Sequence, residues 1–282
     1  MTRQESQEQR RTSPETGAEP TPIISVRDLV VGYGGPPIID GLSIDILPGR
    51  VTAIIGGSGC GKSTLLKSVV GLLTPQAGSV RVAGHDLAAL DEDALVGALS
   101  NVGLLFQQGA LLNSITVAQN VAMPLEVHSR LSREVIALTV RLKLELVGLA
   151  HAAELLPSEL SGGMKKRAGL ARAMVLDPEL LLCDEPSAGL DPQTAADIDQ
   201  LILRLKDTFR MTVVVVTHEL ASIEAIADDV VMLGRGGVLL FSGSKEEAQR
   251  CGVPEVRDFF ARRTPEAGGD TRPLLDVLEG RP

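Results

Sequence analysis

Two short segments near the start of the chain alternate apolar and polar residues with a period of two. The first is Ile23 to Tyr33 (IISVRDLVVGY), and the second is Leu42 to Ile46 (LSIDI). Successive side chains of a strand point to opposite faces of its sheet, so this alternation is typical of strands buried on one face. The pattern predicts antiparallel β structure at the start of the folded region.

Other apolar segments are continuous. Residues 51–55 (VTAII) stop at a glycine cluster, and a helical pattern, KSTLLKSVVGLL, follows from Lys62 and ends before Pro75. Continuous runs are typical of strands with both faces buried. Similar runs lie at residues 102–106, 180–183, 212–216 and 230–233. Buried strands that alternate with helices predict an α/β fold with a parallel sheet, whose ligands bind beyond the carboxyl ends of the strands.

Helical patterns replace strand patterns between Ala110 and Leu176. They are VAQNVAMPL from residue 117, SREVIALTVRLKLELVGL from residue 132 and GMKKRAGLARAMVL from residue 163. A stretch with several helical signals and no strand signal is a separate unit within an α/β chain. We therefore expect an inserted helical subdomain at residues 110–176.

The composition limits which residues can form the core and which partners the protein can bind. Hydrophobic residues make up 44% of the 282 residues but aromatic residues only 2%, so the core must be aliphatic. The formal net charge of -9 disfavours broad electrostatic binding to nucleic acid or to an anionic lipid surface. The mean hydropathy of +0.17 suggests membrane contact, but no segment approaches the ~20 consecutive apolar residues of a spanning helix. We expect a soluble or peripheral protein that binds no nucleic acid.

The two ends of the chain differ from the segment between them. Residues 1–22 carry charges and prolines without an apolar run, so we expect a disordered tail and not a secretory signal. Residues 264–282 are polar except for LLDVL at 274–278, which is either a frayed end or a docking segment for a partner subunit. Three cysteines without disulfide or zinc spacing indicate a reducing compartment. The folded domain is predicted at residues 23–263, in the cytoplasm.

The strongest chemical signal is GGSGCGKST at residues 56–64. Gly56, Gly61, Lys62 and Ser63 match G-x-x-x-x-G-K-[ST] between a predicted buried strand and a predicted helix. In such a loop, backbone N–H groups surround a polyphosphate, the lysine reaches the β- and γ-phosphates and the serine binds Mg²⁺. The other residues expected to contact the nucleotide are Gly57, Ser58, Gly59, Cys60 and Thr64.

Two further strand ends carry residues suited to phosphate chemistry. Asp184 and Glu185 follow the run at 180–183, and His218 emerges just after the run at 212–216. We expect Asp184 to hold Mg²⁺ through its water shell, Glu185 to polarise the attacking water, and His218 to contact the γ-phosphate region. Alone, an Asp-Glu pair is more often a turn or a helix start, and the phosphate loop favours the functional interpretation.

The segment SELSGGMKKRAGLARA at residues 158–173 resembles the signature of the ATP-binding cassette (ABC) ATPases. The LSGG pattern falls on Leu160, Ser161, Gly162 and Gly163. Met164 stands where most members have Gln. The resemblance, which covers residues 23–245, implies a P-loop NTPase (RecA-like) core with an antiparallel β subdomain and an inserted α-helical subdomain. It also implies a homodimer in which each signature closes on the ATP of the opposing subunit.

Further positions match the family. Tyr33 matches the aromatic residue that stacks on adenine, and Gln107 matches the loop glutamine that senses Mg²⁺ and the attacking water and touches the membrane partner. SAGLD at 187–191 matches the loop that joins the two subunits' sites, with Asp191 as its usual acid, and His218 matches the switch histidine. The resemblance implies an ATPase that converts ATP and water to ADP and phosphate. The implied catalytic residues are Lys62, Gln107, Glu185 and His218, and the implied Mg²⁺ ligands are Ser63, Gln107 and Asp184.

A finer resemblance concerns the transported substrate. Residues 104–125 (LLFQQGALLNSITVAQNVAMPL) and 145–164 (ELVGLAHAAELLPSELSGGM) look like the Mla-type phospholipid-transport ATPases, which carry FQ-x-GAL and LSGGM. The resemblance implies an ATPase dimer on the cytoplasmic face of the inner membrane, bound to an MlaE-like integral membrane permease. An MCE-domain lipid-binding protein and a small STAS-domain subunit are the other implied partners.

Three alternatives stay open. The chain could be the ATPase subunit of an ABC transporter for another solute, such as amino acids. A soluble ABC ATPase acting on nucleic acid or ribosomes is disfavoured by the net charge and because the chain has neither a second cassette nor a long coiled coil. A regulatory cassette without hydrolysis is disfavoured because the phosphate loop, the Asp-Glu pair and His218 are all present.

A basic cluster at Lys165, Lys166 and Arg167 follows the signature. It fits either a patch for lipid headgroups or nucleic acid, or a helix face in contact with water. We expect Lys165 and Lys166 to lie on a solvated helix face, whereas Arg167 occupies a position where the family usually keeps arginine.

Overall fold

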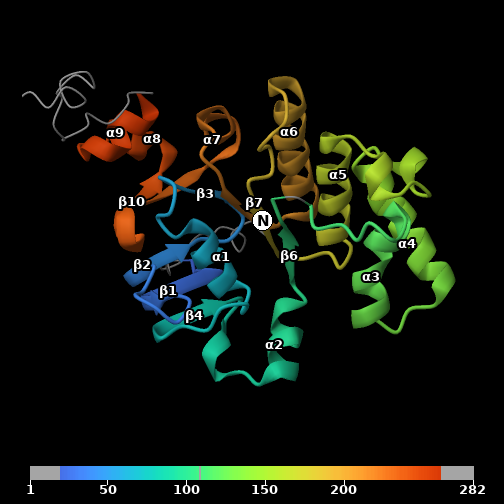
Figure 1. Cartoon of the computed structure of the whole chain (residues 1–282), viewed down its shortest axis with the longest axis horizontal. Coiled ribbons are helices and arrows are strands. Elements are labelled where there is room, and N and C mark those ends of the chain that lie inside the picture. Colours follow the sequence, from blue (N-terminus) through green and yellow to red (C-terminus); the bar gives the residue numbers. More distant parts are fainter. Residues whose placement is uncertain (1–19, 108, 262–282) are drawn as a thin grey trace, which may run out of the picture.

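The computed structural model describes residues 20–107 and 109–261, which form two sheets and the helices packed around them (Figure 1). The predicted tail at 1–22 lies outside the described residues except for its last three positions. The predicted tail at 264–282, with its LLDVL segment, lies wholly outside them.

The first sheet is antiparallel and has the strand order β2-β1-β4-β5. Its strands are β1 (Ile24–Val31), β2 (Ile39–Ile46), β4 (Ala77–Val82) and β5 (His85–Asp86). Every second residue from Leu42 to Ile46 is buried, as the alternation predicted. The alternation of β1 breaks at a register shift beside Asp28, whose φ is 45°.

The second sheet has the order β10-β9-β3-β8-β7-β6, and all neighbours except β10 and β9 are parallel. Its strands are β3 (Val51–Gly56), β6 (Val102–Leu105), β7 (Leu180–Asp184), β8 (Thr212–Val216), β9 (Asp229–Leu233) and β10 (Leu239–Ser244). The parallel sheet predicted from the continuous apolar runs is confirmed.

The helices are α1 (Lys62–Val69), α2 (Glu92–Leu99), α3 (Val117–His128), α4 (Arg133–Leu146), α5 (Gly162–Ala173), α6 (Pro192–Phe209), α7 (Leu220–Ile226), α8 (Lys245–Arg250) and α9 (Pro254–Phe260). In Figure 1, α3, α4 and α5 lie on the side of the molecule away from the antiparallel sheet. Helix α1 ends four residues before the predicted pattern does, because Gly71 turns the chain with a φ of 69°.

The parallel strands are buried on both faces and divide their side chains between two cores. One core, against α3 to α6, receives Leu181, Cys183, Val213 and Val215. The other core, which contains α1 and the antiparallel sheet, receives Leu180, Leu182, Val214 and Val216. Buried members of both cores are aliphatic residues, Met and Cys, which confirms the aliphatic core expected from the composition.

The strand register aligns four carboxyl ends. Val216 of β8 lies opposite Ile54 of β3 and Asp184 of β7, and Cys183 lies opposite Leu105 of β6. The loops that follow β3, β6, β7 and β8 therefore start at one edge of the sheet, where a parallel α/β fold binds its ligands.

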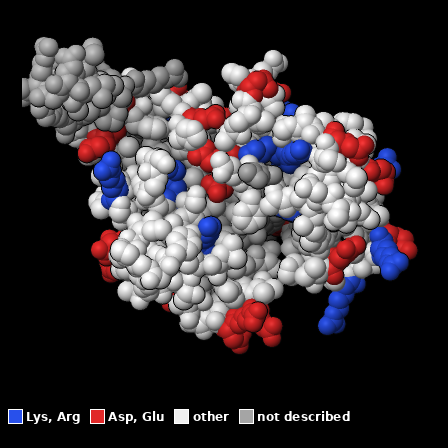
Figure 2. Space-filling view, viewed as in Figure 1, with Lys and Arg blue, Asp and Glu red and all other residues white. Residues whose placement is uncertain are grey.

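The surface seen in Figure 2 has acidic and basic side chains interspersed. Among the described residues, we find no helix that combines the length and the apolar character needed to cross a bilayer.

Helix α5 lies close against β6 because one glycine on each element leaves room at the contact. An ideal Cβ on Gly103 of β6 would lie 2.4 Å from the carbonyl oxygen of Ala173, and one on Gly169 of α5 would lie 2.8 Å from Leu105. Both distances are shorter than real Cβ contacts. The absence of side chains at these positions therefore sets how near α5 approaches the sheet.

We predict that Gly103→Ala lowers the free energy of unfolding by about 1–3 kcal/mol, because the added methyl group pushes α5 off β6. Urea unfolding followed by circular dichroism measures the change. Gly97→Ala in α2 is the matched control, since its Cβ would meet nothing within 4 Å and its φ is not positive. Equal stability of the wild type and the Gly103→Ala variant would show that the contact tolerates a side chain.

Asp199 is a buried carboxyl group on α6. The residue is 3% exposed, and its Oδ1 has no hydrogen-bond partner among the described residues. Burial raises the pKa of Asp199 above its usual value, although a hydrogen bond from Ser222 opposes the shift. The native state therefore binds a proton at this carboxyl more readily than the unfolded state does.

We predict that Asp199→Asn stabilises the fold at pH 7.5, because the buried charge is removed while the side-chain shape is kept. The gain over the wild type should be largest above the raised native pKa. It should shrink as the pH falls, since the wild-type carboxyl then takes up its proton in the folded state. Urea midpoints between pH 4 and 8 measure this gain. A pH-independent difference, or one like that of exposed Asp207→Asn, would contradict the assignment.

Candidate functional site

The phosphate-loop sequence connects β3 to α1, as predicted. Gly56 ends β3 with a φ of 149°, and a Cβ there would lie 2.3 Å from the carbonyl oxygen of Leu233. Gly61 precedes α1 with a φ of 104°. Lys62 begins α1, and its Nζ donates to the carbonyl oxygens of Gly56 (2.8 Å) and Gly57 (3.1 Å). The loop thus needs glycine at both ends and holds the lysine against its own backbone.

The other predicted loop residues fall into two groups. Gly57, Ser58, Gly59 and Ser63 are exposed. Cys60 and Thr64 are buried, at 2% and 6% exposure, and Cys60 packs into the core with α1. Ser58 and Ser63 can offer hydroxyl groups to a ligand, and all four exposed residues can offer backbone. The backbone N–H of Thr64 is suited to the same role, whereas that of Cys60 donates to the carbonyl of Gly57 at 3.3 Å.

The ends of β7 and β8 bring Glu185 and His218 together. Glu185 follows Asp184, and its backbone N–H donates to the carbonyl of Val216 at 2.8 Å. Oε1 of Glu185 lies 2.8 Å from Nδ1 of His218, and its buried Oε2 has no partner among the described residues. One carboxylate oxygen is thus held by the histidine, and the other is suited to accept a hydrogen bond from water.

Asp184 lies in an environment that favours a nearby cation. Burial raises the pKa of Asp184, and the negative charge of Glu185 raises it further. The positive charges of Lys166 and Lys62 oppose this shift. A dication beside Asp184 would lower the electrostatic cost of its charged form in the same way.

The residues present fit a Mg²⁺ ion that is shared with phosphate oxygens. Among the described residues, no group of three or more His, Cys, Asp or Glu side chains could hold a metal by itself. Mg²⁺ is commonly bound by one or two protein groups together with substrate phosphates and water. Exposed Ser63 at the start of α1 and partly exposed Asp184 at the end of β7 meet that requirement.

The signature residues lie at the start of α5. Ser161 caps this helix, since its Oγ accepts from the backbone N–H of Met164 at 3.3 Å. Gly162 is exposed, but Gly163 is buried, and a Cβ on it would lie 2.6 Å from Thr194 of α6. Their close neighbours are therefore on α6 and in the loop before it, and not in the phosphate loop.

Asp191 caps α6 in the same way. Its Oδ1 accepts from the backbone N–H groups of Gln193 (3.2 Å) and Thr194 (3.0 Å). Hydrogen bonds from Thr194 and then Gln193 lower the pKa of Asp191. The structure gives this acid a capping role, and its predicted role at the nucleotide stays a prediction.

Tyr33 lies in the loop after β1 and is 58% exposed. Its hydroxyl accepts from Nζ of Lys67 at 3.1 Å, and the same ammonium lies 5.3 Å from the ring centroid. The hydrogen bond from Lys67 lowers the pKa of Tyr33. The tyrosine is therefore anchored beside α1 with its ring accessible, and its stacking on adenine stays a prediction.

The expectation that Lys166 lies on a solvated helix face is wrong. Lys166 is 6% exposed, and its Nζ donates to the backbone carbonyls of Gln107 and Glu185. The reason is helical periodicity: Gly163, Lys166 and Leu170 share the buried face of α5. That spacing could have been read from the sequence. Lys165 is partly exposed and Gln107 is exposed.

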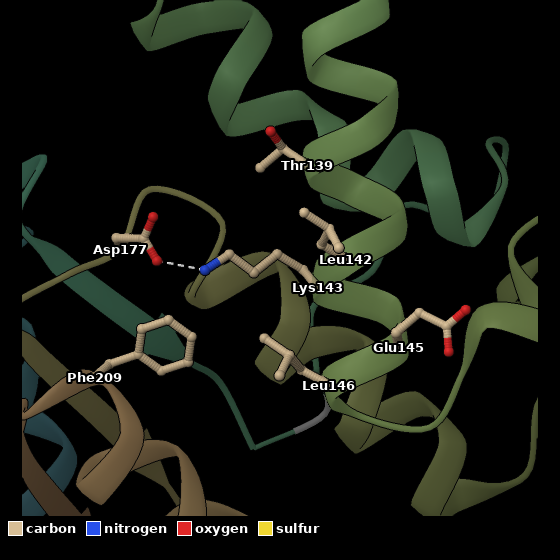
Figure 3. A pocket seen from close by; sticks show the side chains of 7 residues that line it. All are labelled: Thr139, Leu142, Lys143, Glu145, Leu146, Asp177 and Phe209. Atoms are coloured by element: carbon tan, nitrogen blue, oxygen red, sulfur yellow. Dashed lines mark hydrogen bonds and ion pairs between the residues drawn. The ribbon is translucent and has the colours of Figure 1, made fainter.

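A separate pocket lies beside α4, between this helix, the loop before β7 and the end of α6 (Figure 3). Lys143 forms an ion pair with Asp177 there, and its Nζ lies 4.5 Å from the ring centroid of Phe209. Asp177 precedes β7 and Phe209 precedes β8, so the pocket is near the amino ends of these strands. It is therefore not part of the site at the carboxyl ends.

The chain matches one protein-family model and is similar to solved structures. The model of the family described as "ABC transporter" matches residues 39–188. The solved dimer of the ATP-binding cassette MJ0796 bound to ADP and Pi has a TM-score of 0.72 and 28% identity, over 78% of this chain and 98% of that chain. The structure of cbiO1 from Clostridium perfringens, part of the transporter complex cbiONQ, has a TM-score of 0.73 and 27% identity, over 86% and 99%.

Curated relatives are of a similar degree of identity but differ in the substrate they are named for. The intermembrane phospholipid transport system ATP-binding protein MlaF of Haemophilus influenzae is 40% identical over 80% of this chain and 86% of its own length. The "Probable ribonucleotide transport ATP-binding protein mkl" of Mycobacterium leprae is 40% identical over 85% and 69%. The methionine import ATP-binding protein MetN of Caulobacter vibrioides is 42% identical over 88% and 74%.

We predict that Glu185→Gln lowers the rate of ATP turnover about 10²- to 10⁴-fold, because the amide cannot act as a general base. Binding of Mg-ATP should be preserved, and the closed dimer should accumulate. Phosphate release, binding of a fluorescent ATP analogue and gel filtration with ATP measure the three effects. Glu179→Gln is the control, since Glu179 is exposed near the amino end of the same strand. Turnover at the wild-type rate in Glu185→Gln would remove Glu185 from this role.

Proposed function

The chain belongs to the ABC transporter family, and we propose that it powers the transport of phospholipid at the inner membrane. As an ABC ATPase it binds ATP and couples ATP hydrolysis to transport. ABC ATPases dimerise and act with membrane permeases.

The proposed nucleotide site is built at the carboxyl ends of the parallel strands. The phosphate loop binds the phosphates of ATP through its backbone N–H groups, and Lys62 moves from the loop carbonyls to the β- and γ-phosphates. Tyr33 stacks on adenine. Glu185 accepts a proton from the attacking water while His218 orients the carboxylate through the 2.8 Å contact at Oε1.

Mg²⁺ is proposed to be held by Ser63, Gln107 and Asp184, together with phosphate oxygens and water. When bound, it neutralises the charge that develops on the phosphates. The protein's part is to keep Asp184 at the end of a strand and Ser63 at the start of a helix, so that these two of the three ligands are positioned before the nucleotide arrives.

The proposed active unit is a homodimer. Ser161, Gly162 and Gly163 of each subunit close on the ATP bound to the opposing phosphate loop, with Asp191 in the connecting loop. The exposure of Ser161 and Gly162 at the start of α5 supports this arrangement, because a helix N-terminus attracts anions and these residues are accessible to a second subunit.

The support for phospholipid comes from two relatives and two sequence features. MlaF proteins of Haemophilus influenzae and Escherichia coli are 40% and 39% identical to the chain. The FQ-x-GAL pattern lies in the loop after β6, and Met164 follows the signature glycines. We propose the corresponding partners: an MlaE-like permease, an MCE-domain lipid-binding protein and a STAS-domain subunit. The chain would then be peripheral on the cytoplasmic face of the inner membrane.

A methionine importer is the second candidate, and the MetN relative at 42% identity favours it. Nucleotide chemistry is the same for both candidates and does not distinguish them. They differ in the permease and in the solute that raises the ATPase rate, so the test has to include both solutes.

We predict that the chain, purified in detergent with its permease and lipid-binding protein, hydrolyses ATP severalfold faster when phospholipid is added than in detergent alone. Phosphate release measures the rate, and the Lys62→Ala variant of the same complex gives the background. Methionine together with a methionine-binding protein should leave the rate unchanged. Stimulation by methionine and not by phospholipid would replace the proposal with the importer.

A further inference from the structure

Lys166 connects three segments that the sequence treats as separate motifs. Its Nζ donates to the backbone carbonyl of Gln107 at 2.5 Å and to the backbone carbonyl of Glu185 at 2.6 Å. It stands on α5, five residues after Ser161 at the start of the signature. One ammonium group therefore joins the signature helix to the loop after β6 and to the end of β7.

The loop after β6 is held to α5 at further points. Arg172 of α5 donates through Nη2 to the carbonyl of Gly109 (2.8 Å) and through Nη1 to that of Ala110 (2.7 Å). Gly109 and Ala110 have φ values of 72° and 46°, so this turn uses the left-handed region twice in succession. Two cations on one helix thus fix the backbone that follows β6.

The end of β7 has a similar constraint. Glu185 has a φ of 50°, which is unfavourable for a residue with a side chain. The surrounding structure must therefore hold it, and its two backbone groups are both used: the N–H donates to Val216, and the carbonyl accepts from Lys166. The direction in which the Glu185 carboxylate leaves the strand depends on this conformation.

Burying the ammonium group of Lys166 carries a desolvation cost. Burial lowers the pKa of Lys166, although the negative charges of Glu185 and Asp184 oppose the shift. An apolar side chain would avoid that desolvation cost but would leave both carbonyls without this donor. The arrangement is therefore explained by the two carbonyls that Lys166 holds and not by packing alone.

We propose that Lys166 is a positioning residue for ATP hydrolysis: it fixes the backbone of Gln107 and Glu185 relative to the signature helix. In the dimer, the first residues of α5 face the nucleotide of the partner subunit. Lys166 on the same helix holds the hydrolytic residues of its own subunit. A shift of α5 on dimer closure would thus move Gln107 and Glu185 together. This inference rests on the ATPase activity and on the proposed roles of these two residues, and not on the transported substrate.

The first test needs no nucleotide. In the full-length chain, Lys166→Met should speed hydrogen exchange in the backbone that follows β6 and in the backbone that follows β7, because both lose their donor. Other segments should be unchanged. Lys165→Met is the matched control, since Lys165 is the partly exposed neighbour on the same helix. Unchanged exchange in both segments would overturn the proposal, and so would faster exchange throughout the fold.

The second test separates chemistry from binding. Lys166→Met should lower kcat about 10- to 100-fold, because small displacements of reacting groups are costly, and it should change the affinity for a fluorescent ATP analogue by less than about threefold. Lys166→Arg keeps a donor and should restore most of kcat. A normal kcat, or a loss of affinity that accounts for the whole effect, would overturn the proposal.

A third variant keeps the proposal testable if Lys166→Met does not fold. Lys166→Gln retains an uncharged donor on a shorter side chain and is judged by the same two readouts. In addition, Lys166→Met should cost less in a Gln107→Ala background than in the wild type, because part of its effect acts through Gln107. Full additivity would contradict this coupling. All rates are basal, without lipid or solute, so a wrong transported substrate would leave these results unaffected.

Discussion

The register of four parallel strands, β6, β7, β8 and β3, determines what this protein can assemble. Their carboxyl ends are level, so residues from four distant parts of the sequence start from one edge of the sheet. A slip of one residue in any strand would turn its side chains to the opposite core and displace its terminal residue from this edge. The division of Val213 to Val216 between two cores makes such a slip costly. The same packing that stabilises the sheet therefore also places Gly56, Asp184, Glu185 and His218.

Several residues of the site serve the fold and the chemistry together. Ser161 caps α5, Asp191 caps α6, and Gly56 and Gly61 allow backbone geometry that other residues would strain. Each of these local roles is satisfied within the subunit. The proposed contacts with nucleotide would therefore use residues that the fold has already oriented, which limits the ordering that binding has to impose.

Much of this architecture could be predicted from the sequence because its signals are local. Continuous apolar runs identified the strands β3, β6, β7, β8 and β9, and glycine spacing identified the loop before α1. For Lys166 the local signal is misleading, because three consecutive basic residues on a helix resemble a solvated face. Its periodicity with Gly163 and Leu170 indicates a buried face. Its partners, the carbonyls of Gln107 and Glu185, lie 59 and 19 residues away in the sequence, and no local pattern predicts these contacts. The capping role of Asp191 was also missed, because motif matching assigns a residue one role only.

The bonds made by Lys166 end on main-chain carbonyls, and every amino acid possesses one. The contacts that hold positions 107 and 185 therefore do not depend on the chemistry of the side chains there, although the φ of 50° at Glu185 restricts which residues fit. Replacing the hydrolytic side chain at position 185 would therefore leave both main-chain acceptors of Lys166 in place.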